Sequence, residues 1–166
     1  MQVFERILHE VKATAHTMQF YFQGEPLLNP RLAEMIRMAH DAGLYTIVST
    51  NAQALTPAMA QALVDAGLSR IIVSIDGFSQ SSYENYRAGG SLEKALAGLK
   101  AIGDIQTRHC KVILQVLRLS SNEHEWSWVR KHYHELGADR LEFKTAQFYQ
   151  FEHGNPLMPT NERYSR

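Results

Sequence analysis

The sequence is poor in cysteine, since Cys110 is the only one among 166 residues. A single thiol excludes an internal disulfide and fits a protein of the reducing cytoplasm. No apolar run approaches the roughly 20 residues of a membrane-spanning helix, and no secretory signal opens the chain. We therefore expect a cytoplasmic protein without a membrane partner.

The sequence also lacks an excess of charge of either sign. Lysine plus arginine and aspartate plus glutamate both number 17, so the formal net charge is zero. Domains that bind nucleic acids carry a basic face, so we predict no nucleic-acid partner. Linkers rich in Pro, Gly or Ser are absent as well, and the hydrophobic content of 45% suits the core of one domain.

What the chain does contain is a repeated unit of a short β-rich run, a loop and an amphipathic helix. We predict strands at residues 18–23, 45–49, 70–75, 111–117 and 139–144. Helical patterns occupy residues 1–16, 31–43, 57–67, 80–86, 91–102 and 124–137. This alternation forces parallel strand pairing, and the apolar strands should be buried on both faces. The fold class is therefore α/β, and periodicity alone leaves an open sheet and a barrel as alternatives.

Polar residues follow the ends of the predicted strands. The carboxyl ends of parallel strands meet at one edge, so Glu25, Asn51 and Asp76 should lie close together there. Glu25 and Asp76 each have a simpler alternative, because Glu25 could serve the following helix start and Asp76 could belong to a plain turn. His132 and His134 are two residues apart on a predicted helix and make a poor metal pair. The residues alone predict a ligand site at the carboxyl edge and no metal site.

Five stretches, taken in order, resemble the motifs of radical S-adenosylmethionine (SAM) enzymes. They are FQGEPLLNP at 22–30, STNA at 49–52, GLSRIIVSIDG at 67–77, YENYRAGGS at 83–91 and NEHE at 122–125. The corresponding family patterns are G-G-E-P-L-L-N-P, S-T-N-G, G-L-D-x-I-x-V-S-I-D-G, Y-E-x-x-R-x-G-G-S and N-E-x-E. The chain is similar to the subgroup with a cysteine-rich (SPASM-type) C-terminal extension, which includes peptide and protein maturases.

The resemblance implies a partial, TIM-like (β/α)6 barrel that opens at the carboxyl ends of its strands. In such enzymes three cysteines in a C-x-x-x-C-x-x-C motif hold a [4Fe–4S] cluster. An electron from the cluster cleaves SAM to methionine and a 5′-deoxyadenosyl radical, which abstracts a hydrogen atom from the substrate. A peptide, protein or small molecule that undergoes maturation is the substrate class that the resemblance implies.

The resemblance also assigns SAM-binding residues. The turn of Gly24, Glu25 and Pro26 would face the SAM amino group, and Arg87 would pair with its carboxylate. The other residues implied are Ser49, Thr50 and Asn51 near the polar atoms of SAM, and Ser74 and Asp76 towards the ribose. No catalytic residue is assigned.

The main departure from the family is the lack of cluster ligands, because one cysteine cannot replace three. Gln23 and Ala52 also stand where the family has glycine. We expect residues 1–152 to form the barrel portion, without the first strand and cluster loop, and residues 153–166 to lead towards a C-terminal extension. Residues 18–23 and 140–144 would then be open sheet edges that promote self-association.

These departures leave two further hypotheses beside an enzyme core that is inactive alone. The first is a cluster-free module that binds SAM or a nucleotide, or an accessory subunit. The second is a metal-free (β/α) lyase or isomerase, which the lack of a Lys or His base at the carboxyl edge other than Lys144 disfavours.

Overall fold

The computed structural model describes residues 1–147 and 154–164. Its centre is a parallel five-stranded sheet in the order β1-β2-β3-β4-β5, so every strand pairs with its neighbour in sequence. The strands are β1 (Thr17–Gln19), β2 (Tyr45–Thr50), β3 (Arg70–Ser74), β4 (Lys111–Arg118) and β5 (Arg140–Thr145). The predicted α/β class and parallel pairing are confirmed.

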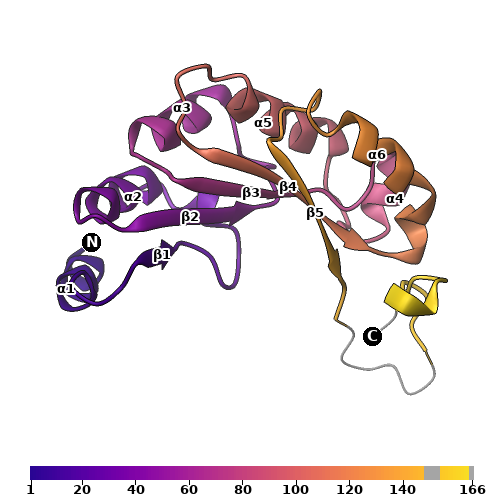
Figure 1. Ribbon diagram of the computed structural model, residues 1–166, viewed down its shortest axis with the longest axis horizontal. Coiled ribbons are helices and arrows are strands. Elements are labelled where there is room, and N and C mark those ends of the chain that lie inside the picture. Colours follow the sequence, from indigo (N-terminus) through magenta and orange to yellow (C-terminus); the bar gives the residue numbers. More distant parts are fainter. Residues whose placement is uncertain (148–153, 165–166) are drawn as a thin grey trace.

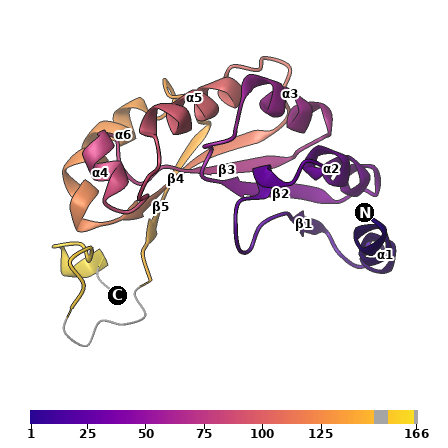
Figure 2. The same ribbon diagram turned by 180° about the vertical axis from the view of Figure 1, so that it is seen from behind.

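Figures 1 and 2 show that the sheet is curved and that helices cover its convex face. The helices are α1 (Gln2–Val11), α2 (Leu32–Asp41), α3 (Pro57–Asp65), α4 (Gln80–Glu84), α5 (Leu92–Gly103) and α6 (Trp126–His132). Short 3-10 turns are η1 (Pro26–Leu28), η2 (Ser120–Glu125) and η3 (Glu162–Tyr164). Within the described ranges, no helix is long and apolar enough to span a membrane.

The core lies between the sheet and the helices on its convex face. Alternate residues of the central strands, such as Val48, Ile71 and Leu114, face this layer and are fully buried. Ile47, Ile72 and Ile113 form a smaller apolar cluster with Tyr21. The central strands are therefore apolar on both faces, as predicted. In β5 every residue is at least partly exposed, which differs from the expectation of full burial.

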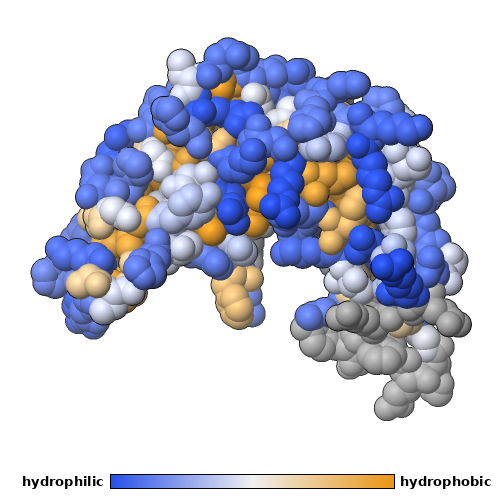
Figure 3. Space-filling view, in the orientation of Figure 1, coloured by the Kyte–Doolittle hydropathy of each residue, from blue (hydrophilic) through white to orange (hydrophobic). Residues whose placement is uncertain are grey.

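The first strand is shorter than the predicted strand at 18–23. The N–H of Phe20 still donates to the carbonyl of Ile47 (2.9 Å), but the chain then leaves the sheet. Among the described residues β1 pairs only with β2, so residues 20–23 have no second partner to hold them extended. In Figure 3 the loop after β1 projects as a hydrophobic tip, and Phe22 there is 94% exposed.

Two predicted helices are also shorter than their patterns. The amphipathic pattern at 1–16 yields a helix that ends at Val11 and buries only Leu8. The pattern at 124–137 is preceded by η2, and α6 ends at His132. Asn122 explains the 3-10 start, because its side chain accepts from the N–H of Leu119 (3.1 Å) and donates to the carbonyl of Leu117 (2.9 Å).

Side-chain caps begin α3 and α5, whereas α2 has no side-chain cap hydrogen bond. Thr56 and Ser91 each accept a hydrogen bond from the backbone three residues on, at 3.2 Å. Gly67 follows α3 with a φ of +81°, and a Cβ there would collide with the ring of His40. These local signals explain why the helix bounds match the sequence pattern well around α3 and α5.

Residues 154–164 return to the exit of β4. The N–H of Ser120 donates to the carbonyl of Leu157 (3.1 Å), and the N–H of Thr160 donates to Glu123 (2.6 Å). Residues 154–164, which belong to the expected exit segment, are therefore held by hydrogen bonds against the exit of β4. The boundary predicted at residues 152 and 153 lies outside the described residues.

Candidate functional site

A hollow of about 360 Å³ opens at the carboxyl ends of β2 and β3, and we call it the carboxyl-edge hollow. It is lined by Gly24, Glu25, Ser49, Thr50, Asn51, Ser74 and Arg87. Every residue that the motifs assigned to SAM lies in this lining except Pro26 and Asp76. The structure thus brings together residues that are up to 63 positions apart in the chain, from Gly24 to Arg87 (87 − 24).

Glu25 ties two loops of the hollow together. Its Oε1 accepts from the N–H of Leu27 (3.1 Å), which caps η1, and from the hydroxyl of Thr50 (2.6 Å). Its Oε2 accepts from the N–H of Asn51 (2.8 Å). Glu25 therefore has the helix-start role that the sequence left open, and it also fixes the exit of β2. Pro26 opens η1 beside it.

Asp76 lies beneath the hollow with a fully buried side chain. Its Oδ2 accepts from Nε (2.7 Å) of Arg87 and pairs with Nη2 (2.6 Å) of the same residue. Its Oδ1 accepts from the N–H of Leu117 (2.7 Å), and its carbonyl accepts from Asn122 (3.0 Å). Asp76 is thus more than a turn residue, because it links the exits of β3 and β4 and holds Arg87 in the wall of the hollow.

Other polar groups of the hollow remain available to a ligand. In the described part of the chain, the hydroxyl of Ser49 and the side-chain amide nitrogen of Asn51 have no hydrogen-bond partner. Ser74 only accepts a long hydrogen bond from Gln115 (3.4 Å). The ionisable groups in the lining are Glu25 and Arg87, and both are bonded within the protein. The hollow can therefore bind a polar ligand through neutral groups and one guanidinium.

A second hollow of about 660 Å³ adjoins the first and shares Asn51 and Arg87 with it. Its wall contains Tyr83 and Gln53, and burial raises the pKa of the Tyr83 hydroxyl. Gln53 donates to that hydroxyl (3.1 Å) and accepts from the N–H of Ser91 (3.0 Å). The sequence reasoning missed Gln53, because a glutamine after a strand exit carries no motif signal.

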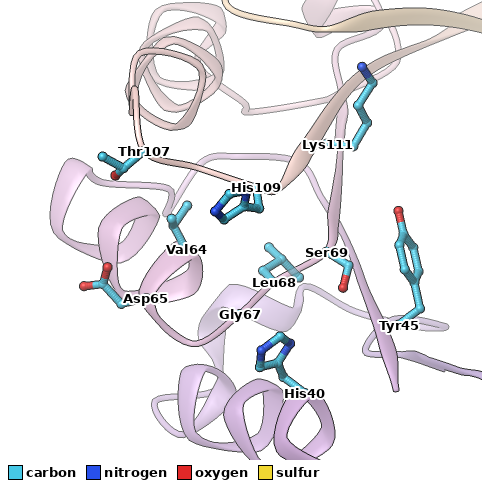
Figure 4. A pocket seen from close by; sticks show the side chains of 10 residues that line it. All are labelled: His40, Tyr45, Val64, Asp65, Gly67, Leu68, Ser69, Thr107, His109 and Lys111. Carbon is cyan, nitrogen blue, oxygen red and sulfur yellow. The ribbon is translucent and has the colours of Figure 1, made fainter. Parts of the chain in front are cut away.

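A further pocket of about 460 Å³ lies at the opposite, amino edge of the sheet (Figure 4). Figure 4 shows His40, His109 and Lys111 around it, from the end of α2, the loop before β4 and the start of β4. Helix C-termini present free carbonyls at this edge, and cationic side chains stabilise them there. Arg37, for example, donates to the carbonyl of Asp65 (2.7 Å). Arg37 therefore helps to join α2 to the end of α3 at this edge.

The described residues do not fit a [4Fe–4S] cluster. Cys110 precedes β4 at the amino edge, away from the carboxyl-edge hollow, and is 2% exposed. Burial raises the pKa of its thiol to about 12, whereas a cluster ligand must be a thiolate. Across 1–147 and 154–164, no group of three His, Cys, Asp or Glu side chains could hold a metal ion.

Comparisons with known proteins agree with the motif evidence. The family model of the Radical SAM superfamily matches residues 2–127. The PqqA peptide cyclase of Ruegeria pomeroyi is 31% identical over 151 residues, which cover 89% of this chain and 39% of that relative. The AdoMet-dependent heme synthase of Methanosarcina barkeri is 34% identical over 99 residues, 59% of this chain and 28% of the relative. The chain thus spans about two fifths or less of these curated relatives.

Solved structures show the same fold. SuiB of Streptococcus suis gives a TM-score of 0.74 at 14% identity over 96% of this chain and 36% of that one. The structure of anSMEcpe with bound AdoMet and the Kp18Cys peptide gives a TM-score of 0.71 at 16% identity, over 99% of this chain and 46% of that one. The sheet is therefore a portion of the radical SAM partial barrel, and the chain belongs to the radical SAM superfamily.

Proposed function

We propose that this chain is the SAM-binding core of a radical SAM enzyme that acts in peptide maturation. The observation that carries the proposal is the carboxyl-edge hollow, where the exits of successive strands gather the motif residues of the family. Such a site lies where parallel α/β folds bind their ligands. When bound, SAM would supply the adenosyl group from which the family forms its radical, whereas the reducing electron would have to come from a cluster that the described residues do not hold.

The contacts in the hollow divide its residues into two roles. Glu25, Thr50 and Asp76 would position the loops, because their side chains are bonded within the protein. Ser49, Asn51 and Ser74 would contact SAM with the polar groups that remain available. Gly24, whose φ of +79° suits glycine, would offer backbone groups without a Cβ in the way, and the uncommitted guanidinium nitrogen of Arg87 would face the carboxylate.

A peptide substrate is proposed from the relatives. PqqA peptide cyclases of three bacteria are among them, and one similar structure is SuiB bound to its precursor peptide SuiA. The concave face of the sheet lies next to the carboxyl-edge hollow and, among the described elements, no helix covers it (Figures 1 and 2). We place the peptide on this side.

Isothermal titration calorimetry of the chain with SAM tests the proposal. The change Ser49→Ala should weaken SAM binding by about fivefold to tenfold, because one hydrogen bond contributes roughly 1 kcal/mol. Thr107→Ala is the matched control, because it removes a hydroxyl at the opposite edge and should leave binding unchanged. The absence of heat with the unaltered, folded chain would refute SAM binding at this site.

The second candidate is a cluster-free SAM-binding or accessory module, favoured by the single buried cysteine. The chain should then bind SAM but form no 5′-deoxyadenosine when iron, sulfide and reductant are supplied anaerobically. We expect this result for the chain alone. Formation of 5′-deoxyadenosine by the chain would contradict it and would leave the SAM-binding proposal standing.

A further inference from the structure

Three arginines gather around three aromatic rings on the convex side of the exit of β4. Arg118 lies over the rings of Tyr164 (4.3 Å), Phe143 (5.2 Å) and Trp126 (5.9 Å), measured from the guanidinium carbon to each ring centre. Arg130 lies over Phe143 (4.6 Å) and Arg163 over Tyr164 (5.9 Å). We call these six residues the arginine–aromatic cluster.

Among the side chains that the structure describes, no carboxylate pairs with the positive charges of the cluster. In the part of the chain that the structure describes, the ion pairs involve other residues, and none includes Arg118, Arg130 or Arg163. The Nε of Arg118 is buried and has no hydrogen-bond partner. Burial, helped by the charges of Arg130 and Arg163, lowers the pKa of Arg118. A charge in such surroundings is costly unless an anion compensates it.

Packing of the rings explains only part of this arrangement. Cation–π contacts with Arg118 connect β4, β5, α6 and the segment that ends in η3, and so help to hold that segment in place. Arg130 and Arg163 are exposed, however, and each adds a like charge beside Arg118. Exposed like charges weaken such packing, so their presence points to a ligand.

The cluster is separate from the carboxyl-edge hollow. It is built from the outer side of β4 and β5, from α6 and from the C-terminal segment, whereas the hollow lies at the exits of β2 and β3. Figure 1 shows α6 and the yellow C-terminal segment at the β5 end of the sheet, away from β1 and β2. A ligand of the cluster would therefore bind without displacing SAM.

We propose that the arginine–aromatic cluster binds the carboxylates of an acidic peptide segment. Arginine guanidinium groups pair well with carboxylates. The three cations come from three different elements and alternate with aromatic rings, which suits a chain that alternates acidic and apolar side chains. A single phosphate would instead require donors that converge on one point, often with backbone N–H groups at a helix start or glycine-rich loop.

Tryptophan fluorescence provides a direct test. Trp126 and Trp128 are the two tryptophans, and Trp128 is 45% exposed. In a Trp128→Phe background Trp126 reports on the cluster alone. A blocked Glu-Phe-Glu-Phe-Glu peptide should change its emission in a saturable way. The matched Gln-Phe-Gln-Phe-Gln peptide should bind about tenfold more weakly or not at all, because removal of each charge-assisted hydrogen bond weakens binding roughly fivefold or more.

Two variants and one control complete the design. Arg130→Gln and Arg163→Gln should each weaken binding of the glutamate peptide by about fivefold to tenfold. Arg6→Gln removes an exposed arginine on α1, which pairs with Glu10, and should have no effect. Circular dichroism checks that all variants are folded.

The outcomes decide the proposal. Equal binding of the glutamate and glutamine peptides would overturn it, as would unchanged affinity in Arg130→Gln and Arg163→Gln. A response to inorganic phosphate without a response to the glutamate peptide would overturn the peptide assignment. Because SAM binding is measured separately by calorimetry, failure here leaves the proposed function intact.

Discussion

At the scale of the single residue, Ala52 has an unusual backbone conformation. Its φ is +59°, the left-handed region that costs roughly 1–2 kcal/mol for a residue other than glycine. The N–H of Ala52 donates to the hydroxyl of Thr50 (2.9 Å), and its carbonyl accepts from Leu55 (3.2 Å), so the turn is fixed from both sides. Glycine stands here in the family pattern that the chain resembles.

We expect Ala52→Gly to change the free energy of unfolding by less than about 1 kcal/mol. Relief of the strain is offset by the lost burial of one methyl group and by the freer unfolded backbone of glycine. Ala52→Val should lose more than about 2 kcal/mol, because a β-branched residue is disfavoured at positive φ and the site is 1% exposed. Urea unfolding followed by circular dichroism measures both. Equal losses in the two variants would contradict this account.

The sequence could predict which residues meet at the carboxyl edge, but not which hydrogen bonds and ion pairs each of them forms. Parallel pairing determines that strand exits converge, so Glu25, Asn51 and Asp76 were expected together. The commitment of Glu25 to the exit of β2, and of Asp76 to Arg87, depends on distances between loops that no local pattern encodes. For the same reason the cluster around Arg118 was not predicted, because its members come from β4, α6, β5 and η3.

At the scale of elements, Arg108 and Asp139 join α5, β4 and β5. The guanidinium donates to both carboxylate oxygens of Asp139 (2.8 Å each) and to the carbonyl of Cys110 (2.7 Å). Asp139 also accepts from the N–H of Val112 (2.7 Å). Burial acts to raise the pKa of Asp139, but the hydrogen bonds from Arg108 and Val112 prevail, and the pKa lies below its ordinary value.

The depressed pKa of Asp139 predicts a pH dependence of stability. Its contribution is present above the unfolded pKa of about 3.9 and is lost as the pH falls through the lower folded value. Asp139→Asn should therefore cost about 1–3 kcal/mol at pH 7, and this difference from the unaltered chain should shrink towards pH 3. Urea unfolding at several pH values tests this.

Asp104→Asn is the matched control for Asp139→Asn. Asp104 pairs with Lys100 on the surface of α5, and its side chain is 59% exposed. Such a pair contributes about 0.5 kcal/mol or less, so its loss should matter little at any pH. A constant difference between the unaltered chain and Asp139→Asn from pH 7 to pH 3 would show that the ionised pair is not the cause.

Elements with strong local signals were predicted best. The caps at Thr56 and Ser91 and the glycine after α3 gave bounds close to those of α3 and α5. The strand predicted at 18–23 was wrong beyond Gln19, because its length depends on partners in space and not on the apolar pattern of 18–23. The helix predicted at 124–137 was also wrong at its start, because the side chain of Asn122 forms hydrogen bonds with the backbone of Leu117 and Leu119.

At the scale of the whole molecule, the sheet has one covered and one open side. Helices pack on the convex face, and none of the described helices covers the concave face (Figures 1 and 2). At the edges of the sheet, no further described strand pairs with β1 or β5. The two edges differ in character. β5 carries Arg140, Glu142 and Lys144, and charged side chains discourage edge pairing. β1 carries no charge and adjoins exposed Phe22.

We therefore expect the chain to self-associate, and to do so through β1. The N–H of Phe20 faces β2, where it bonds Ile47, so the N–H of Gln19 points to the open edge. Gln19→Pro should thus reduce association without removing a bond to β2. Light scattering after size exclusion at rising concentration measures this.

Glu142→Pro is the matched control, because the N–H of Asp139 faces β4 and alternation turns the N–H of Glu142 outward. A monomer at every concentration would refute self-association, and an equal effect of both prolines would refute the assignment to β1.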